Sequence, residues 1–294
     1  MQPSRTGPFK YVPINRRPKL EWPNGARVAL WIIPNVETFP LNEPVPGGLG
    51  KVPDVYNWAT REYGARVGVY RIMDVLERHG MKGSVMLNSE VCDDHPELIQ
   101  DMMKLGWEML GHNQSNSRYL YQYSAEDERK LVLDVFNKIE KATGQRPKGW
   151  LSSGLSETWN TLDYLIEAGG QYVCDWICDD QPYMMNVGGK RLVSVPYSGE
   201  INDLPAMLRG GHSPEEFDRM IRRQFDTLYA EGAKSGRVMA IALHPFIIGV
   251  PHRISALDSA LRYILAHDGV WKTTGAEICA AWLKSPQAQQ QKAA

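Results

Sequence analysis

Three residues whose side chains can transfer protons each follow a short apolar run of the sequence: Glu37, His112 and His244. A carboxylate and two imidazoles can together supply a base for water, an acid for a leaving nitrogen and a third polar group. Each residue also has a plainer interpretation. Glu37 could pair with an arginine at a rim, His112 could be a loop residue bonded to backbone, and His244 could pack on Pro245. The pattern predicts a hydrolase if the fold brings the three together.

Seven apolar runs alternate with segments of helical period, which is typical of parallel βα units. The apolar runs span residues 27–33, 83–87, 107–110, 148–152, 171–176, 191–196 and 237–243. The helical segments span residues 64–79, 95–105, 124–143, 157–168, 214–232, 255–267 and 275–284. Ligands bind at the carboxyl ends of such strands. We therefore predict an α/β fold with its chemistry at that edge of the sheet.

Further polar residues follow the same strands, and we predict that they bind substrate: Asn35, Asn116, Ser153, Tyr197, Asn202 and Asp203. Asp203, together with Asn202, is expected to support His244. Trp159 is predicted to line the pocket, with a core or rim position as the alternative. Because Glu37 follows a fully apolar run, we expect burial to raise the pKa of its carboxyl, which would suit a general base.

Composition excludes several classes of partner. The 294 residues contain 33 Lys and Arg against 34 Asp and Glu, and the pI is near 6.7. This balance gives no electrostatic case for nucleic acid or an anionic membrane, so we expect a small-molecule substrate. The N-terminus has no apolar signal region and no 18-residue apolar run occurs, which predicts a cytoplasmic protein.

Three parts of the chain are distinguished by composition. The first part, residues 1–25, is rich in Pro, Arg and Lys, and we expect an extended arm that could wrap a neighbouring subunit. We expect one catalytic barrel over residues 26–285 and a polar tail that frays over residues 286–294. The four cysteines are too few for a disulfide framework. Cys174 and Cys178 are expected to pack as small apolar residues, with a metal or redox role left open.

Four stretches of the sequence resemble the polysaccharide deacetylase family, also called the NodB-homology fold or carbohydrate esterase family four. They are N-V-E-T at residues 35–38, G-H-N-Q-S-N at 111–116, V-P-Y-S-G-E-I-N-D-L-P at 195–205 and A-L-H-P-F-I-I-G-V-P-H-R at 242–253. The resemblance covers roughly residues 20–285. It implies a distorted (β/α)7 barrel, with Glu37 in the position of the base and His244 in that of the general acid.

The metal-ligand positions of that family are changed in this chain. Thr38 stands where the family has an Asp ligand, and Asn116 stands where it has a second His. The arginine of the family's R-x-P-Y motif is absent, because residues 151–154 are Leu-Ser-Ser-Gly. Only His112 remains a good ligand, whereas a catalytic zinc normally has three.

These departures resemble the branch of the family recruited to allantoinase and cyclic imide hydrolysis, whose allantoinase-type members are regarded as working without a metal. The resemblance implies ring opening of a small cyclic imide, amide or ureide. Glu37 would activate water, His244 would protonate the leaving nitrogen, and His112, with Asn116 or Ser153, would orient the substrate or stabilise the oxyanion. The same resemblance implies no cofactor and a homo-oligomer.

Two alternatives stay open. One is a metal-dependent N-deacetylase of an amino sugar, in which Glu37 and His112 hold a divalent ion such as zinc together with a third ligand, such as Glu90 or Asp203. The other is a catalytically silent barrel that binds a small ligand, since fold alone does not determine function.

Overall fold

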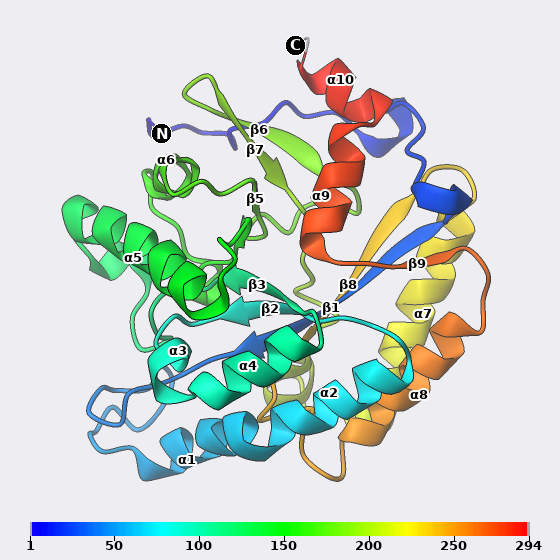
Figure 1. The fold of residues 1–294 in the computed structure, drawn as a ribbon. Coiled ribbons are helices and arrows are strands. Elements are labelled where there is room, and N and C mark those ends of the chain that lie inside the picture. The colour runs from blue at the N-terminus through cyan, green and yellow to red at the C-terminus, as the bar shows by residue number, and fades with distance from the viewer. Residues whose placement is uncertain (1, 293–294) are drawn as a thin grey trace.

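The computed structural model describes residues 2–292, which form a mixed α/β fold around a curled sheet (Figure 1). The strand order is β6–β7–β5–β4–β3–β2–β1–β8, and β9 also pairs with β1. This is the predicted distorted (β/α)7 barrel, open on one side. The strands are β1 (Val28–Val36), β2 (Ser84–Leu87), β3 (Glu108–Gly111), β4 (Gly149–Trp150), β5 (Tyr172–Val173), β6 (Tyr183–Val187), β7 (Lys190–Ser194), β8 (Arg237–Leu243) and β9 (Val270–Lys272).

Parallel pairing brings the carboxyl ends of the central strands to one edge. Strand β1 pairs with β8 over seven residues, from Val28 opposite Arg237 to Pro34 opposite Leu243, and its far end pairs with β2. The β6–β7 hairpin is antiparallel and adds a strand that the sequence analysis did not predict. On the open side, an isolated parallel bridge joins Asn202 to Ala242 of β8.

Helices cover the outer face of the sheet, and each predicted helix is present within a few residues, except that the first begins earlier, at Val55. The helices are α1 (Val55–Tyr63), α2 (Val69–Arg78), α3 (Val91–Asp94), α4 (Pro96–Lys104), α5 (Ala125–Thr143), α6 (Thr161–Glu167), α7 (Pro214–Gly232), α8 (Ile254–Leu265), α9 (Gly275–Leu283) and α10 (Pro286–Lys292). A π-helical turn, Gly64–Gly68, joins α1 to α2. Among residues 2–292, no helix is long and apolar enough to cross a membrane.

Alternate residues of β1 belong to two different apolar clusters. Val28, Leu30 and Ile32 pack in the cluster beneath the helices, which we call the outer core. Ala29, Trp31 and Ile33 pack in a second cluster on the other face, which we call the inner core. A strand that is buried on both faces reads as a continuous apolar run, which is why residues 27–33 carry no alternation.

The N-terminal arm packs on its own chain. Phe9 contacts the rings of Trp176 and Tyr183, with centroid distances of 5.7 and 4.8 Å. Arg17 forms a bidentate ion pair with Asp179. In Figure 1 the arm runs beside the β6–β7 hairpin.

The polar tail is ordered as helix α10 up to Lys292, contrary to the expected fraying, and residues 293–294 lie outside the described range. The Gln291 side chain accepts a hydrogen bond from the backbone N–H of Met184 at 2.7 Å. The Gln287 side chain donates to the backbone oxygen of Pro18 at 2.8 Å. The tail therefore fastens the arm and the hairpin to the barrel.

Candidate active site

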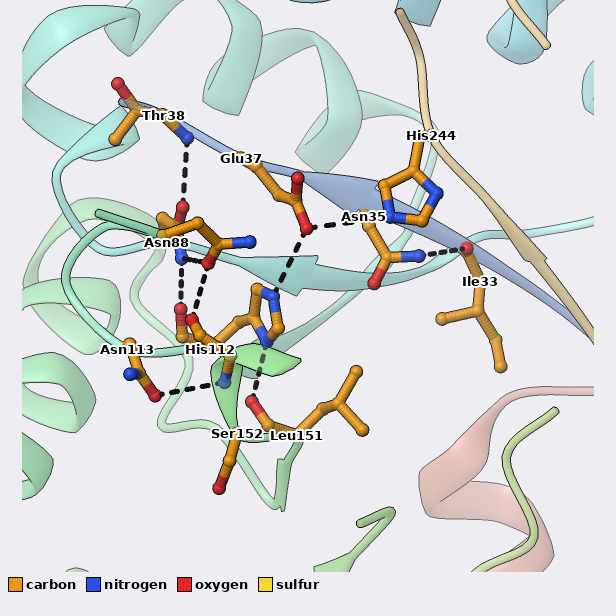
Figure 2. Close-up of polar contacts among 12 residues, drawn as sticks. Ile33, Asn35, Glu37, Thr38, Asn88, His112, Asn113, Leu151, Ser152 and His244 are labelled. Carbon is orange, nitrogen blue, oxygen red and sulfur yellow. Dashed lines mark hydrogen bonds and ion pairs between the residues drawn. The ribbon is translucent and has the colours of Figure 1, made fainter. Parts of the chain in front are cut away.

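Glu37, His112 and His244 each occupy the first position after a strand, at the ends of β1, β3 and β8. They continue the inner-face parity of their strands, since Ile33, Leu110 and Ala242 all belong to the inner core. Parallel strands end at the same edge, so the three side chains converge (Figure 2).

Glu37 lies between the two imidazoles. Its Oε1 is 3.5 Å from Nε2 of His112 and 3.6 Å from Nε2 of His244. All three side chains are buried, at 7% exposure or less. The structure therefore brings together the three residues that were predicted to be catalytic.

His244 is held from behind by Asp203, as predicted. Nδ1 of the ring donates to Oδ1 of Asp203 at 2.7 Å, which directs Nε2 to Glu37. The Asp203 carboxylate also accepts from the backbone N–H groups of His244 and Ile248. Burial by itself lowers the pKa of His244, but the charges of Glu37 and Asp203 outweigh it and raise this pKa to about 10. The ring is an imidazolium at neutral pH.

The pKa of Glu37 is shifted in the opposite direction to the prediction. Burial, the largest influence, does raise it, but the charge of His244 and the polar contacts with both imidazole Nε2 atoms, at 3.5 and 3.6 Å, together exceed that effect. The pKa of the carboxyl lies well below its usual range. The sequence argument was wrong because an apolar strand reveals the desolvation of its last residue but not the cations that converge on it.

His112 is oriented by the backbone of the neighbouring strand end. Its Nδ1–H donates to the carbonyl oxygen of Leu151 at 2.6 Å, so Nε2 faces Glu37 and makes no hydrogen bond to any residue of 2–292. Asp175, which the sequence analysis missed, fixes this segment by accepting from the backbone N–H and the hydroxyl of Ser152, both at 2.7 Å. His112 therefore combines the two interpretations given to it from the sequence: its ring is bonded to backbone, and it also lines the site.

Asn116 and Ser153 form part of a polar network below His112. Oδ1 of Asn116 accepts from Ser153 Oγ and from the Asn88 side chain, and Asn88 also donates to the backbone oxygen of His112. Asn113, next to His112, has a φ of 54°, a left-handed conformation that asparagine adopts more readily than most residues. The network fixes the loop that carries the imidazole.

A second chain of polar groups lies near His244. The Asn202 side chain donates to Tyr197 Oη at 3.2 Å, and that hydroxyl donates to Asn35 Oδ1 at 3.4 Å. Asn35 in turn donates to the backbone oxygen of Leu243 at 3.1 Å. Three predicted binding residues thus form one connected wall.

The catalytic candidates and most of the predicted binding residues line one cavity of about 390 Å³. Its lining contains Asn35, Glu37, His112, Asn116, Tyr197, Asn202 and His244. Ser153 contacts Asn116 from behind the lining. Trp159, predicted to line the pocket, is 46% exposed and is not among the residues that line this cavity. A larger cavity, of about 570 Å³ beneath the N-terminal arm, contains none of the predicted catalytic residues.

The sequence analysis missed two arginines that line the catalytic cavity, Arg61 and Arg209. Arg61 lies on α1, within a segment whose helical character was not predicted, and Arg209 ends a π-helical turn, Leu204–Arg209. Neither arginine directly follows an apolar run, and the other site residues were predicted because they do.

The family's metal positions do not form a ligand set in this chain. The Thr38 hydroxyl points to Asp94, at 3.4 Å in an exposed contact, and Asn116 Oδ1 already accepts from two donors. Glu90 and Asp203 do not complete a set with Glu37 and His112, and residues 2–292 contain no group of three or more His, Cys, Asp or Glu residues that could hold a metal ion. The donors present do not fit the family's divalent ion.

The cysteines take no part in this site. All four are free thiols; Cys174 is buried in the inner core, and the exposed Cys178 has its sulfur 3.1 Å from the Tyr183 hydroxyl.

The curled βα sheet thus carries a carboxylate and two imidazoles at its carboxyl edge. Residues 52–173 match the polysaccharide deacetylase family model. This match, together with the relatives below, makes the chain similar to the polysaccharide deacetylase (NodB-homology) domain family.

Three relatives cover most of the chain. A probable polysaccharide deacetylase from Pseudomonas aeruginosa PAO1 is 29% identical with a TM-score of 0.84, over 93% of this chain and 96% of that one. PuuE allantoinase is 28% identical with a TM-score of 0.83, over 92% and 95%. A curated protein of Schizosaccharomyces pombe, whose name places it among the polysaccharide deacetylases, is 26% identical over 240 residues, 75% of this chain and 74% of that protein.

Proposed function

We propose that this protein opens the ring of a small cyclic imide, amide or ureide by hydrolysis, without a metal ion. The observation that carries the proposal is the placement of Glu37 between two imidazoles, 3.6 Å from a His244 whose pKa is raised to about 10. The base is already ionised and the acid already protonated at neutral pH.

The reaction begins when Glu37 accepts a proton from water and the oxygen attacks a ring carbonyl. As the tetrahedral intermediate collapses, the C–N bond breaks and Nε2 of His244 gives its proton to the leaving nitrogen. The products are one carboxyl group and one N–H group in the opened chain. Proton transfer from Glu37 back to His244 restores the pair, and the new carboxyl loses its proton to solvent.

His112 orients the substrate or stabilises the oxyanion beside Glu37, since its unpartnered Nε2 faces the cavity. The Asn116 and Ser153 network holds this ring in place. An imide suits weak electrophilic assistance because its nitrogen is a better leaving group than that of an ordinary amide. Thr38 and Asn116 offer no set of ligands for a divalent ion, which supports a route without one.

The likeness to PuuE allantoinase over nearly the whole chain agrees with a ring-opening activity. We further propose a cytoplasmic homo-oligomer as the working form, with a small-molecule substrate and neither nucleic acid nor membrane as partner.

The test is turnover of succinimide, glutarimide, hydantoin, dihydrouracil, allantoin and N-acetylglucosamine oligomers, with and without EDTA. Ring opening that survives EDTA supports the proposal. Activity confined to the acetylated sugar and abolished by EDTA would replace it with the metal-dependent deacetylase, and no turnover of any compound would favour a silent barrel.

A further inference from the structure

Arg61 lies on the wall of the catalytic cavity with its guanidinium between two phenyl rings. Its Cζ is 4.8 Å from the ring centroid of Phe39 and 4.7 Å from that of Phe246. Phe39 follows Glu37 by two residues, and Phe246 follows His244 by two. The strand ends that hold the acid–base pair therefore also fix the plane of the guanidinium.

One edge of that guanidinium is held, and the other makes no hydrogen bond within residues 2–292. Nη1 donates to the side-chain and backbone oxygens of Asn57 at 3.0 and 3.3 Å, and Asn57 is bonded in turn to Asp54. Nε is buried and has no hydrogen-bond partner in residues 2–292. Arg222 uses its Nε and Nη2 to hold the two oxygens of Asp218, at 2.7 and 3.0 Å. The equivalent edge of Arg61 has no such carboxylate.

The charges that line the cavity leave a positive surplus. Arg61 and Arg209 line it against a single carboxylate, that of Glu37, which two imidazoles already share. Burial lowers the pKa of Arg61 more than the nearby charges of Glu37 and Asp54 raise it, and no carboxylate of the described chain forms an ion pair with its guanidinium. A ligand acceptor bound in the cavity would give this buried donor the partner that the chain does not supply.

We propose that Arg61 and Arg209 form a carboxylate subsite, and that the ring this enzyme opens bears a carboxylate substituent. The inference rests on the proposed function, because it names which cyclic imides and ureides that site takes. The Nε–Nη2 edge of Arg61 matches the two oxygens of a carboxylate. The exposed Arg209, at the cavity mouth, adds charge that draws an anion in.

The test compares each ring with the same ring bearing a carboxylate substituent: hydantoin with hydantoin-5-acetate, and dihydrouracil with dihydroorotate. The wild-type enzyme is expected to favour the carboxylated member by about 10- to 100-fold in kcat/KM, the effect of one charge-assisted bidentate pair. Arg61→Met should abolish this preference and Arg61→Lys should keep part of it. Arg209→Ala, at an exposed position where folding is not at stake, should reduce it by about threefold. Arg66→Met, an exposed arginine outside the cavity, should leave it unchanged.

Binding separates this inference from the proposed function. Calorimetry on Glu37→Gln, which cannot complete the reaction, should show hydantoin-5-acetate bound at least tenfold more tightly than hydantoin, and Arg61→Met in that background should remove the difference. If no ring is opened but this binding difference is seen, the subsite stands and ring opening falls. If wild-type enzyme opens both members of each pair equally well, or if Glu37→Gln binds them equally or binds neither, the subsite is overturned.

Discussion

Oε1 of Glu37 lies 3.6 Å from Nε2 of His244, and the far nitrogen of the same ring bonds to Asp203 at 2.7 Å. The imidazole thus has one carboxylate in front of it, at the cavity, and one behind it in the core. Each carboxylate favours the imidazolium, and the imidazolium in turn keeps Glu37 ionised. This mutual stabilisation sets the protonation states that ring opening requires.

The pH profile of kcat/KM should follow His244. With a pKa near 10 the acid stays protonated through neutral pH, so activity is flat there and falls as pH rises through about 10. Asp203→Asn removes one of the two carboxylates, so the alkaline limb should move at least about one unit lower. Asp258→Asn, which removes the carboxylate bonded to the distant His79, is the control and should leave the limb in place. An unmoved limb in Asp203→Asn would contradict the assignment of His244 as acid.

Removal of either proton-transfer group should abolish most of the activity while leaving the fold intact. Glu37→Gln and His244→Gln are each expected to lower kcat/KM by about 10²- to 10⁴-fold, and the double variant by much less than the product. Circular dichroism and the thermal midpoint check folding. Glu90→Gln is the control, since Glu90 was a candidate third metal ligand. A comparable loss there would favour the metal-dependent alternative.

Gly68 lies against the loop that carries His244. A Cβ at Gly68 would come 2.0 Å from the backbone oxygen of Pro245, which no packing allows, so the π-helical turn or the loop must move. Gly68→Ala should lower the free energy of unfolding by about 1–3 kcal/mol and also reduce kcat/KM. Urea unfolding and steady-state kinetics measure the two effects. Val67→Ala, at the partly exposed neighbouring residue, should change neither appreciably; native-like values for Gly68→Ala would contradict this packing account.

The sequence predicted the fold well where a strand is apolar on both faces or a helix is strongly periodic. The same logic placed Glu37, His112 and His244 at one edge, because residues directly after parallel strands share that edge. The sequence did not predict strand β6 or helix α10. Helix α10 is held by hydrogen bonds between glutamine side chains and distant backbone groups, such as the bond that the Met184 N–H donates to Gln291. Such contacts leave no periodic signal in the sequence.

The electrostatics of the site could not be read from the sequence for a related reason. The pKa of Glu37 depends on two histidines 75 and more residues away, and their distances follow only from the folded sheet. Arg61 reaches the cavity because Phe39 and Phe246, from opposite ends of the chain, enclose its guanidinium. Proximity of this kind is created by tertiary packing.

The most direct test of the central claim is hydrolysis of the imide and ureide panel by enzyme that has been treated with EDTA and then freed of the chelate. Glu37 and His244 need no metal in the proposed reaction, so kcat/KM on the best ring substrate should stay within about twofold of untreated enzyme. Glu37→Gln should show the same loss of about 10²- to 10⁴-fold in both preparations. Loss of ring opening after EDTA, restored by added zinc, would contradict the account.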